Sequence, residues 1–333
     1  MTYALLLWPH ANQRYEEAAQ EPAAAELDII LSSVSVQTLC KYREIKGVGA
    51  LIFEAETLAP HQLHSVCRHS LLYWFGILED ENTFKPMFAS PQAYLGDDLA
   101  FIQKYKGKTN ERFTQQLINM ALYSCRFADC DTQIQLLDPM CGRGTTLFQA
   151  ANREWDVFGI DADKKDVHEC ASFFEKYLKY HKLKHKRTQS SKTLKDQPAV
   201  MVQKFQYGGE KGNEHTLMVG AGDCKNALQI YGREAVHLVV CDLPYGVQHA
   251  PNGKGGADSF ERMLKECLPV WKQTLKKGGA VALSYNTHTL KTESVRNLME
   301  EAGFSVLRGG GYDRMTHWVE QAVVRDIAVC IKK

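Results

Sequence analysis

The segment CDLPYG (residues 241–246) ends an apolar run with residue types that can do chemistry. The preceding VHLVV predicts a buried strand. Asp242 then places a carboxylate at the strand end, Pro244 stops the ladder, and Tyr245 offers an aromatic face. A structural turn with a rim aromatic would use the same residue types. Both interpretations stay open until the other motifs are considered.

A glycine-containing loop, DPMCGRGTT (138–146), follows another predicted strand. Gly142 and Gly144 allow a tight turn and a close approach to a ligand, and the next helix begins with unpaired N–H groups. Asp138 disfavours a phosphate and favours a cationic group. Because Leu147 replaces the third glycine of the dinucleotide fingerprint, and no Lys–Ser/Thr pair follows, neither dinucleotide nor Walker-type binding is expected.

Two more acids follow the next predicted strands. Asp161 ends DVFGID, where it can accept hydrogen bonds from ribose hydroxyls, and Asp223 in GAGDC is placed to meet an adenine amino group. Each acid alone is better explained as a turn residue at a strand end or as a helix cap. Together with Asp138 they describe a nucleoside with a cationic tail and no phosphate, a description that S-adenosylmethionine fits.

The pattern that must position these residues starts at about residue 111, where apolar runs alternate with amphipathic segments. This alternation predicts a parallel sheet covered by helices. Strands are predicted at 133–138, 156–161, 216–223, 236–242, 280–286, 304–309 and 321–333. Helices are predicted at 111–124, 145–154, 164–180, 258–275 and 293–303. We expect an α/β, Rossmann-like seven-stranded sheet whose final hairpin adds an antiparallel strand.

Residues 1–95 differ in character and predict a small α+β domain, with strands at 3–8 and 49–55 and helices at 23–33 and 61–72. A ferredoxin-like arrangement is one way to combine them. We therefore divide the chain into an accessory domain at 1–95 and a main domain at 96–333.

A polar, lysine-rich insertion at about 181–215 interrupts the main domain. Lys184, Lys186 and Arg187 lie close together within it. An irregular segment of this length is usually functional or disordered. Its composition fits either a solvated excursion or a contact with a polyanion.

The composition limits the classes of partner. The chain has 333 residues, 44% of them hydrophobic, and a net charge of +1, so attraction to nucleic acid requires a local patch. Its ten cysteines form no CxxC pair, and cysteines and histidines do not alternate at the spacings of metal-binding motifs, so no metal is expected. Scattered single cysteines are typical of reduced thiols, so we expect a cytoplasmic location. No apolar run is long enough to span a bilayer and no cleavable leader is evident, so no membrane is expected.

In order and interval, DPMCGRGTT, GIDAD, GDC and CDLPYG resemble the motifs of class I S-adenosylmethionine-dependent methyltransferases, over about residues 101–333. Gly246 and the segment KYKGKTNERFTQQLINMA (104–121) narrow the resemblance. They look like the UPF0020 group of RNA methylases, which includes tRNA guanosine N2-methyltransferases related to THUMP-containing enzymes.

This resemblance implies methyl transfer to an exocyclic base amine, with guanosine N2 in tRNA as the leading substrate. Asp242 and the backbone carbonyl of Leu243 would accept the amine hydrogens, Pro244 would fix the turn, and Tyr245 would stack on the target base. The implied cofactor-binding residues are Asp138, Cys141, Gly142, Gly144, Thr145, Asp161, Ala162, Asp223, Cys224, Asp242, Thr109 and Asn110. The substrate-binding residues would be Tyr245, Gly246, Lys184, Lys186 and Arg187. Helix capping explains Thr109 and Asn110 equally well.

Several alternatives stay open. Residues 1–95 are shorter than a full THUMP module, so the basic insertion, a small activating partner subunit or a homodimer could complete the contact with tRNA or another structured RNA. Adenine N6 methylation of DNA or RNA uses the same acceptor geometry on a flipped base. If the chain is not an enzyme, the alternative is a non-catalytic binding subunit with a methylase fold. Glutamine methylation is disfavoured because its sites have Asn at the position of Asp242.

Overall fold

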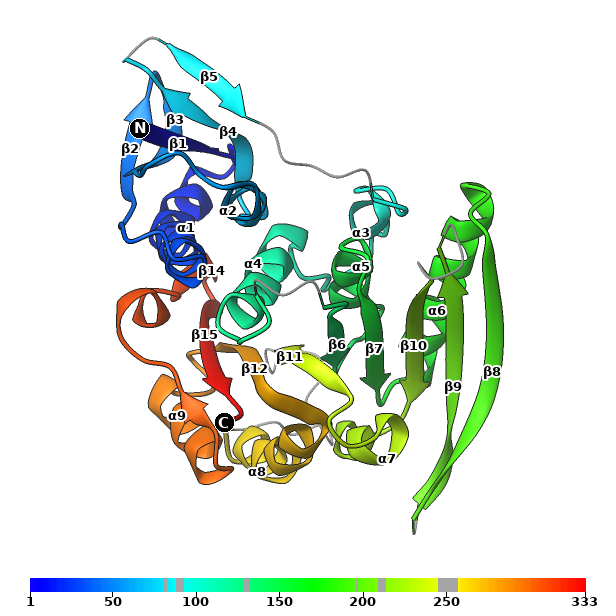
Figure 1. The fold of residues 1–333 in the computed structure, drawn as a ribbon. Helices are drawn as coiled ribbons and strands as arrows, with labels where there is room; N and C mark the ends of the chain where they lie inside the picture. Colours follow the sequence, from blue (N-terminus) through cyan, green and yellow to red (C-terminus); the bar gives the residue numbers. More distant parts are fainter. Residues whose placement is uncertain (81–82, 88–92, 129–131, 196, 209–213, 245–256) are drawn as a thin grey trace.

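The computed structural model describes residues 1–80, 83–87, 93–128, 132–195, 197–208, 214–244 and 257–333 (Figure 1). Two sheets organise the chain, with five and ten strands among the described residues.

The first sheet is antiparallel and has the strand order β2-β3-β1-β4-β5. Its elements are β1 (Thr2–Leu7), α1 (Gln13–Ser33), β2 (Lys41–Ile45), β3 (Val48–Glu54), α2 (Pro60–Val66), β4 (Leu72–Leu78) and β5 (Phe84–Met87). Since α1 connects β1 to β2 and α2 connects β3 to β4, the first four strands have the ferredoxin-like arrangement, and β5 is added at the edge. The expected small α+β fold is confirmed, although the sequence patterns missed β2, β4 and β5.

The second sheet has the order β13-β15-β12-β11-β6-β7-β10-β9-β8, and β14 pairs with β15. Its strands are β6 (Gln135–Asp138), β7 (Asp156–Asp161), β8 (His185–Leu194), β9 (Gln197–Tyr207), β10 (His215–Ala221), β11 (Val236–Asp242), β12 (Leu275–Asn286), β13 (Ser305–Val306), β14 (His317–Glu320) and β15 (Val323–Ile331). The associated helices are α3 (Leu99–Ile102), α4 (Glu111–Leu122), α5 (Thr145–Ala151), α6 (Lys164–Tyr180), α7 (Ala227–Tyr231), α8 (Ala257–Thr274) and α9 (Thr292–Glu301). All seven predicted strands are present, and β15 runs antiparallel to β12. The Rossmann-like methyltransferase fold is therefore confirmed.

The insertion at 181–215 is more regular than the sequence suggested. β8 and β9 form a long antiparallel hairpin that extends the sheet beyond β10. Most side chains of β8 are exposed, so the segment lacks the apolar alternation that identifies a strand in a sequence. The expectation of an irregular excursion was wrong.

One hydrophobic core passes from the first sheet through α1 and α4 into the second sheet. At this junction the buried Glu26 of α1 accepts hydrogen bonds from the Ser70 N–H (2.9 Å) and from Asn119 Nδ2 of α4 (2.6 Å). A buried carboxylate needs such donors because its charge is costly to remove from water. The position of a domain boundary near residue 95 stays a prediction.

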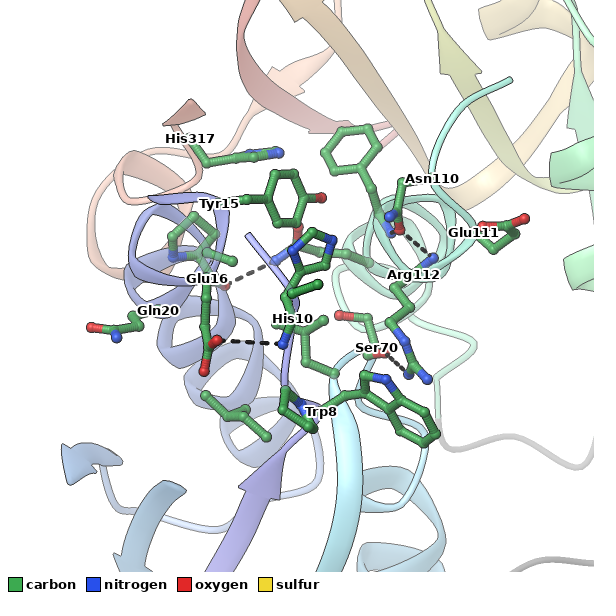
Figure 2. A pocket seen from close by; sticks show the side chains of 18 of the residues that line it. Trp8, His10, Tyr15, Glu16, Gln20, Ser70, Asn110, Glu111, Arg112 and His317 are labelled. Atoms are coloured by element: carbon green, nitrogen blue, oxygen red, sulfur yellow. Dashed lines mark hydrogen bonds between the residues drawn. The ribbon is translucent and has the colours of Figure 1, made fainter. Parts of the chain in front are cut away.

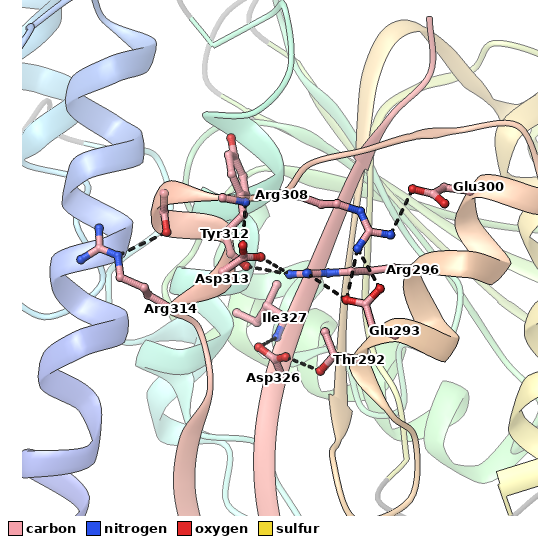
Figure 3. A network of polar contacts seen from close by, with 12 residues as sticks. Thr292, Glu293, Arg296, Glu300, Arg308, Tyr312, Asp313, Arg314, Asp326 and Ile327 are labelled. Carbon is pink, nitrogen blue, oxygen red and sulfur yellow. Dashed lines mark hydrogen bonds and ion pairs between the residues drawn. The ribbon is translucent and has the colours of Figure 1, made fainter.

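A polar network joins α9 to the 3₁₀ turn at 310–313 (Figure 3), and ion pairs of Arg314 extend it to α1. Arg296 of α9 donates to Asp313 Oδ1 (2.6 Å) and to the carbonyl of Tyr312 (3.2 Å). Arg314 pairs with Asp28 and Glu21 of α1. These contacts connect the segment between α9 and β14 to the first helix of the chain.

Within the described ranges, no helix is long and apolar enough to cross a membrane. The histidines, cysteines and acids of the same residues form no group of three or more that could hold a metal ion.

Candidate active site

Four acids meet at one edge of the second sheet. β11, β6, β7 and β10 are consecutive parallel neighbours, so their carboxyl ends lie together. Asp242, Asp138 and Asp161 end the first three of these strands, and Asp223 follows the fourth. The structure thus brings together the acids that the sequence placed at strand ends. Ligands of open α/β sheets bind outside this edge.

The glycine loop reaches from β6 to the acid that ends β7. The Gly142 N–H donates to Asp161 Oδ2 (2.7 Å), and the Asp163 N–H donates to Asp161 Oδ1 (2.9 Å). Gly142 and Gly144 have φ angles of +48° and +93°, which favour glycine. A Cβ on Gly144 would lie 2.5 Å from Cys170 Sγ, whereas one on Gly142 would meet nothing within 4 Å. The loop is packed at Gly144 and open at Gly142.

Asp138 is the most buried of the four acids, with 3% of its surface exposed. It accepts a hydrogen bond from the Met140 N–H (3.0 Å). Burial, together with repulsion by the Asp161 and Asp242 carboxylates, raises the pKa of Asp138 to about 7. A cationic ligand would relieve this excess of negative charge, so the edge fits the sulfonium and ammonium groups of S-adenosylmethionine.

Thr109 and Asn110 have different contacts. Thr109 Oγ1 donates to Asp242 Oδ2 at 2.5 Å, which fixes this carboxylate from the segment before α4. The Asn110 side chain caps α4 by accepting from the Arg112 and Phe113 N–H groups. The capping alternative is therefore confirmed for Asn110, while the role of either residue toward a cofactor stays a prediction.

The remaining residues predicted for the cofactor are distributed around the loop and the next strand. Cys141 and Thr145 are buried, and Ala162 is exposed. Asp223 caps the following 3₁₀ turn by accepting from the Lys225 N–H (2.9 Å). Cys224 is buried, with its Sγ 3.2 Å from Cys267 Sγ.

Tyr105 was missed from the sequence, although it lies in the same KYKG segment as the motif residues. Its hydroxyl lies 3.1 Å from Thr145 Oγ1, at the start of α5, and the Arg143 guanidinium lies over its ring at 4.8 Å. Burial raises the pKa of Tyr105 to about 12, so the hydroxyl stays protonated. This contact places an aromatic ring beside the glycine loop.

The segment predicted to be catalytic, residues 242–245, lies partly within the described residues. Leu243 is 1% exposed and its N–H donates to the carbonyl of Ser284 (2.9 Å), so β11 continues in register with β12 past Asp242. Pro244 follows at partial burial. Tyr245 and Gly246, predicted to contact the substrate, lie outside the described residues.

Lys184, Lys186 and Arg187 lie away from the four acids. His185 pairs with Tyr207, which pairs with His215 at the start of β10, so this part of the hairpin is at the amino edge of the parallel strands. Arg187 also forms an ion pair with Glu175. The structure does not bring these three cations to the carboxyl edge.

Residues 119–311, more than half of the chain, match the model of the UPF0020 family, described as an RMKL-like methyltransferase domain. The chain belongs to this family. Its members are S-adenosylmethionine-dependent methyltransferases of the RNA methylase type, so S-adenosylmethionine is the cofactor, in agreement with the chemistry of the four acids.

Several solved structures are similar at low identity. TrmN from Thermus thermophilus is 14% identical, with 89% of this chain and 60% of that chain covered and a TM-score of 0.42. PH0851 is 10% identical, with 99% and 59% covered and a TM-score of 0.42. Magnesium protoporphyrin IX methyltransferase from Synechocystis PCC 6803, with bound S-adenosylmethionine, is 18% identical, with 69% and 87% covered and a TM-score of 0.38. No curated protein matches the sequence.

Proposed function

We propose that this chain methylates an exocyclic amine of a nucleic-acid base, with guanosine N2 in tRNA as its substrate. The contact between Thr109 and Asp242 is the main support, because it orients a carboxylate at the end of β11, in the same row of acids as Asp138. The family supports RNA as the class of substrate.

The chemistry required of the protein is to make a poor nucleophile reactive. The lone pair of an exocyclic base amine is conjugated into the ring. Hydrogen-bond acceptors aimed at its two hydrogens favour the pyramidal form, whose lone pair can attack. Asp242 supplies one acceptor, and the backbone carbonyl of Leu243 supplies the second. S-adenosylmethionine, when bound, supplies a methyl group on a positively charged sulfur. The amine gains the methyl group and loses one proton, to Asp242 or to water.

The other acids hold and orient the cofactor in this proposal. Asp138 faces its cationic part, Asp161 accepts from the ribose hydroxyls, and Asp223 meets the adenine amino group. Gly142 leaves room for close approach. Much of the rate then comes from the fixed relative positions of amine and methyl donor.

The proposal extends to partners and compartment. We assign RNA binding to the ferredoxin-like unit at 1–95, with a small activating subunit or a second copy of the chain as the expected complement. The cytoplasm, as a reducing compartment, suits the nine free cysteines of the described residues.

The test is methyl transfer from radiolabelled S-adenosylmethionine to unmodified tRNA, rRNA and DNA in separate reactions, each digested to nucleosides. Label in N2-methylguanosine from tRNA is the expected result. Label in N6-methyladenine would show that the methylated base is adenine, as in the alternative reaction. Cofactor binding without label in any nucleic acid would contradict the proposal.

A further inference from the structure

A cavity of about 310 Å³ lies between the ferredoxin-like unit and the start of α4 (Figure 2). Its walls come from the segment after β1, the first turns of α1, the end of the loop before β4, and α4 itself. Among the lining residues are Trp8, Tyr15, Glu16, Arg112, Phe113 and His317. This volume is at the lower end for small-molecule pockets, which suits a ligand the size of one nucleobase.

Aromatic rings and an arginine surround the cavity and continue onto the surface. Trp8 is 44% exposed, and the Arg112 guanidinium lies over its ring at 4.0 Å. The exposed Tyr73 meets Trp8 edge to face at 5.0 Å, and Trp74 next to it is also exposed. Exposed aromatic rings beside arginine are the surface on which proteins stack unpaired bases.

Polar groups in the same cavity can bind the edge of a base. The Glu16 carboxylate lies in this cavity and accepts a hydrogen bond from the backbone N–H of His10 (3.3 Å). Burial, with the nearby Arg325, lowers the pKa of His317 to about 4, so its ring is neutral near pH 7. Its Nδ1 lies 3.5 Å from the carbonyl of Met315, to which it donates, and this leaves Nε2 as an acceptor for a donor on the base. The edge of a base carries both hydrogen-bond donors and hydrogen-bond acceptors.

The cavity lies next to the candidate active site along the chain. Thr109 contacts Asp242, and the following residue, Asn110, lines the cavity. The same short stretch of chain before α4 therefore connects the two places, so one RNA molecule can contact both.

We propose that this cavity holds one unstacked base of the RNA substrate while another nucleotide of the same RNA is methylated. The inference rests on the proposed function and names the contact by which the ferredoxin-like unit takes part in it. Trp8 stacks on the base, and Glu16 and His317 bind its edge.

The experiment measures the Kd of the full-length chain for an unmodified tRNA transcript by filter binding, and its Kd for S-adenosylmethionine by calorimetry. Trp8→Ala removes the ring and Trp8→Phe keeps a smaller one. Tyr180→Ala removes another exposed ring, at the end of α6, and serves as the matched control. We expect Trp8→Ala to weaken tRNA binding about tenfold, Trp8→Phe to stay within about threefold, and Tyr180→Ala to match the unmodified chain. None should change the affinity for S-adenosylmethionine.

Tryptophan fluorescence provides a second readout that a structural role would not change. RNA should quench the emission of the unmodified chain, and the quench should be smaller in Trp8→Phe although this variant still binds. Unchanged tRNA affinity in Trp8→Ala, or no RNA binding by the unmodified chain, would overturn the inference and leave a side chain of a partner protein as the expected occupant.

The two proposals fail separately. If tRNA acquires no N2-methylguanosine but Trp8→Ala still weakens tRNA binding, the proposed reaction fails and the cavity assignment holds. If methylation occurs and Trp8→Ala changes neither the Kd nor the KM for tRNA, the cavity assignment fails alone.

Discussion

Gly142 and Gly144 share a left-handed backbone but differ in their surroundings, and this difference separates folding from ligand binding. Gly144→Ala puts a Cβ against Cys170 and should cost about 1–3 kcal/mol of unfolding free energy. Gly142→Ala meets open space and should cost about 1 kcal/mol, from backbone strain alone. Because the cofactor is expected in that space, Gly142→Ala should still lower the affinity for S-adenosylmethionine at least about tenfold.

Thermal unfolding and calorimetric titration of the two glycine variants check this prediction. Normal cofactor binding by Gly142→Ala would show that the ligand does not approach the loop at this residue.

Asp138 should make both cofactor binding and stability depend on pH. Its carboxyl pKa is about 7 in the folded chain and about 3.9 in an unfolded one, so the folded state holds the proton more tightly. The group therefore favours folding at low pH and opposes it increasingly as the pH rises from about 4 to about 7. Asp138→Asn should raise the thermal midpoint of the ligand-free protein at pH 8 more than at pH 5.

The affinity for S-adenosylmethionine should follow the opposite trend with pH. A cation is bound by the ionised carboxylate, so affinity should rise between pH 6 and pH 8 in the unmodified chain, and this rise should be absent in Asp138→Asn. A flat profile in the unmodified chain would show that Asp138 does not contact the cationic group.

At this scale the sequence predicted which acids meet at the edge of the sheet but not how they are held. The strand ends placed Asp138, Asp161 and Asp242 at one edge because parallel strands end together. The Thr109–Asp242 hydrogen bond joins residues 133 positions apart, and no local pattern marks it. Asn110 is the opposite case, because its capping contacts are to the next two or three residues and are visible as a helix-start signal.

At the scale of elements, the network around α9 distinguishes a buried arginine from an exposed one. The Arg296 side chain is 8% exposed and binds Asp313 and the carbonyl of Tyr312, while Arg308 is 38% exposed and pairs with Glu293 and Glu300. Arg296→Ala should lower the unfolding free energy by about 1–3 kcal/mol, because it removes a buried side chain and the two hydrogen bonds by which it holds the turn at 310–313 to α9. Arg308→Ala should change stability little, since water screens its pairs.

Urea unfolding of both arginine variants tests the comparison, each serving as the other's control. Equal losses would mean that burial does not determine the strength of these contacts.

Elements with a clear apolar period were predicted well, and elements without one were not. The bounds of β7, α6 and β11 agree with the predictions at 156–161, 164–180 and 236–242. β8, the outer strand of its hairpin with β9, was missed because it exposes most of its side chains, as was β2, which buries almost nothing. Such edge strands are defined by backbone pairing with a neighbour, which residue types do not report.

At the scale of the whole molecule, the ferredoxin-like unit and the methyltransferase sheet share one hydrophobic core. This shared core places α4 so that its start contacts both Asp242, through Thr109, and the aromatic cavity. The cavity draws its walls from residues between Leu7 and His317, so neither half of the sequence contains it. Lys184, Lys186 and Arg187, by contrast, are grouped in the sequence yet lie at the opposite edge of the sheet.

The most direct measurement of the central claim compares Asp242→Ala with the unmodified chain, in methyl transfer to tRNA and in binding of S-adenosylmethionine. Loss of one positioned catalytic group should lower the single-turnover rate at least about 10²-fold. The Kd for the cofactor should change far less, because Asp138, Asp161 and Asp223 remain. Full methylation by Asp242→Ala would contradict the assignment of the active site.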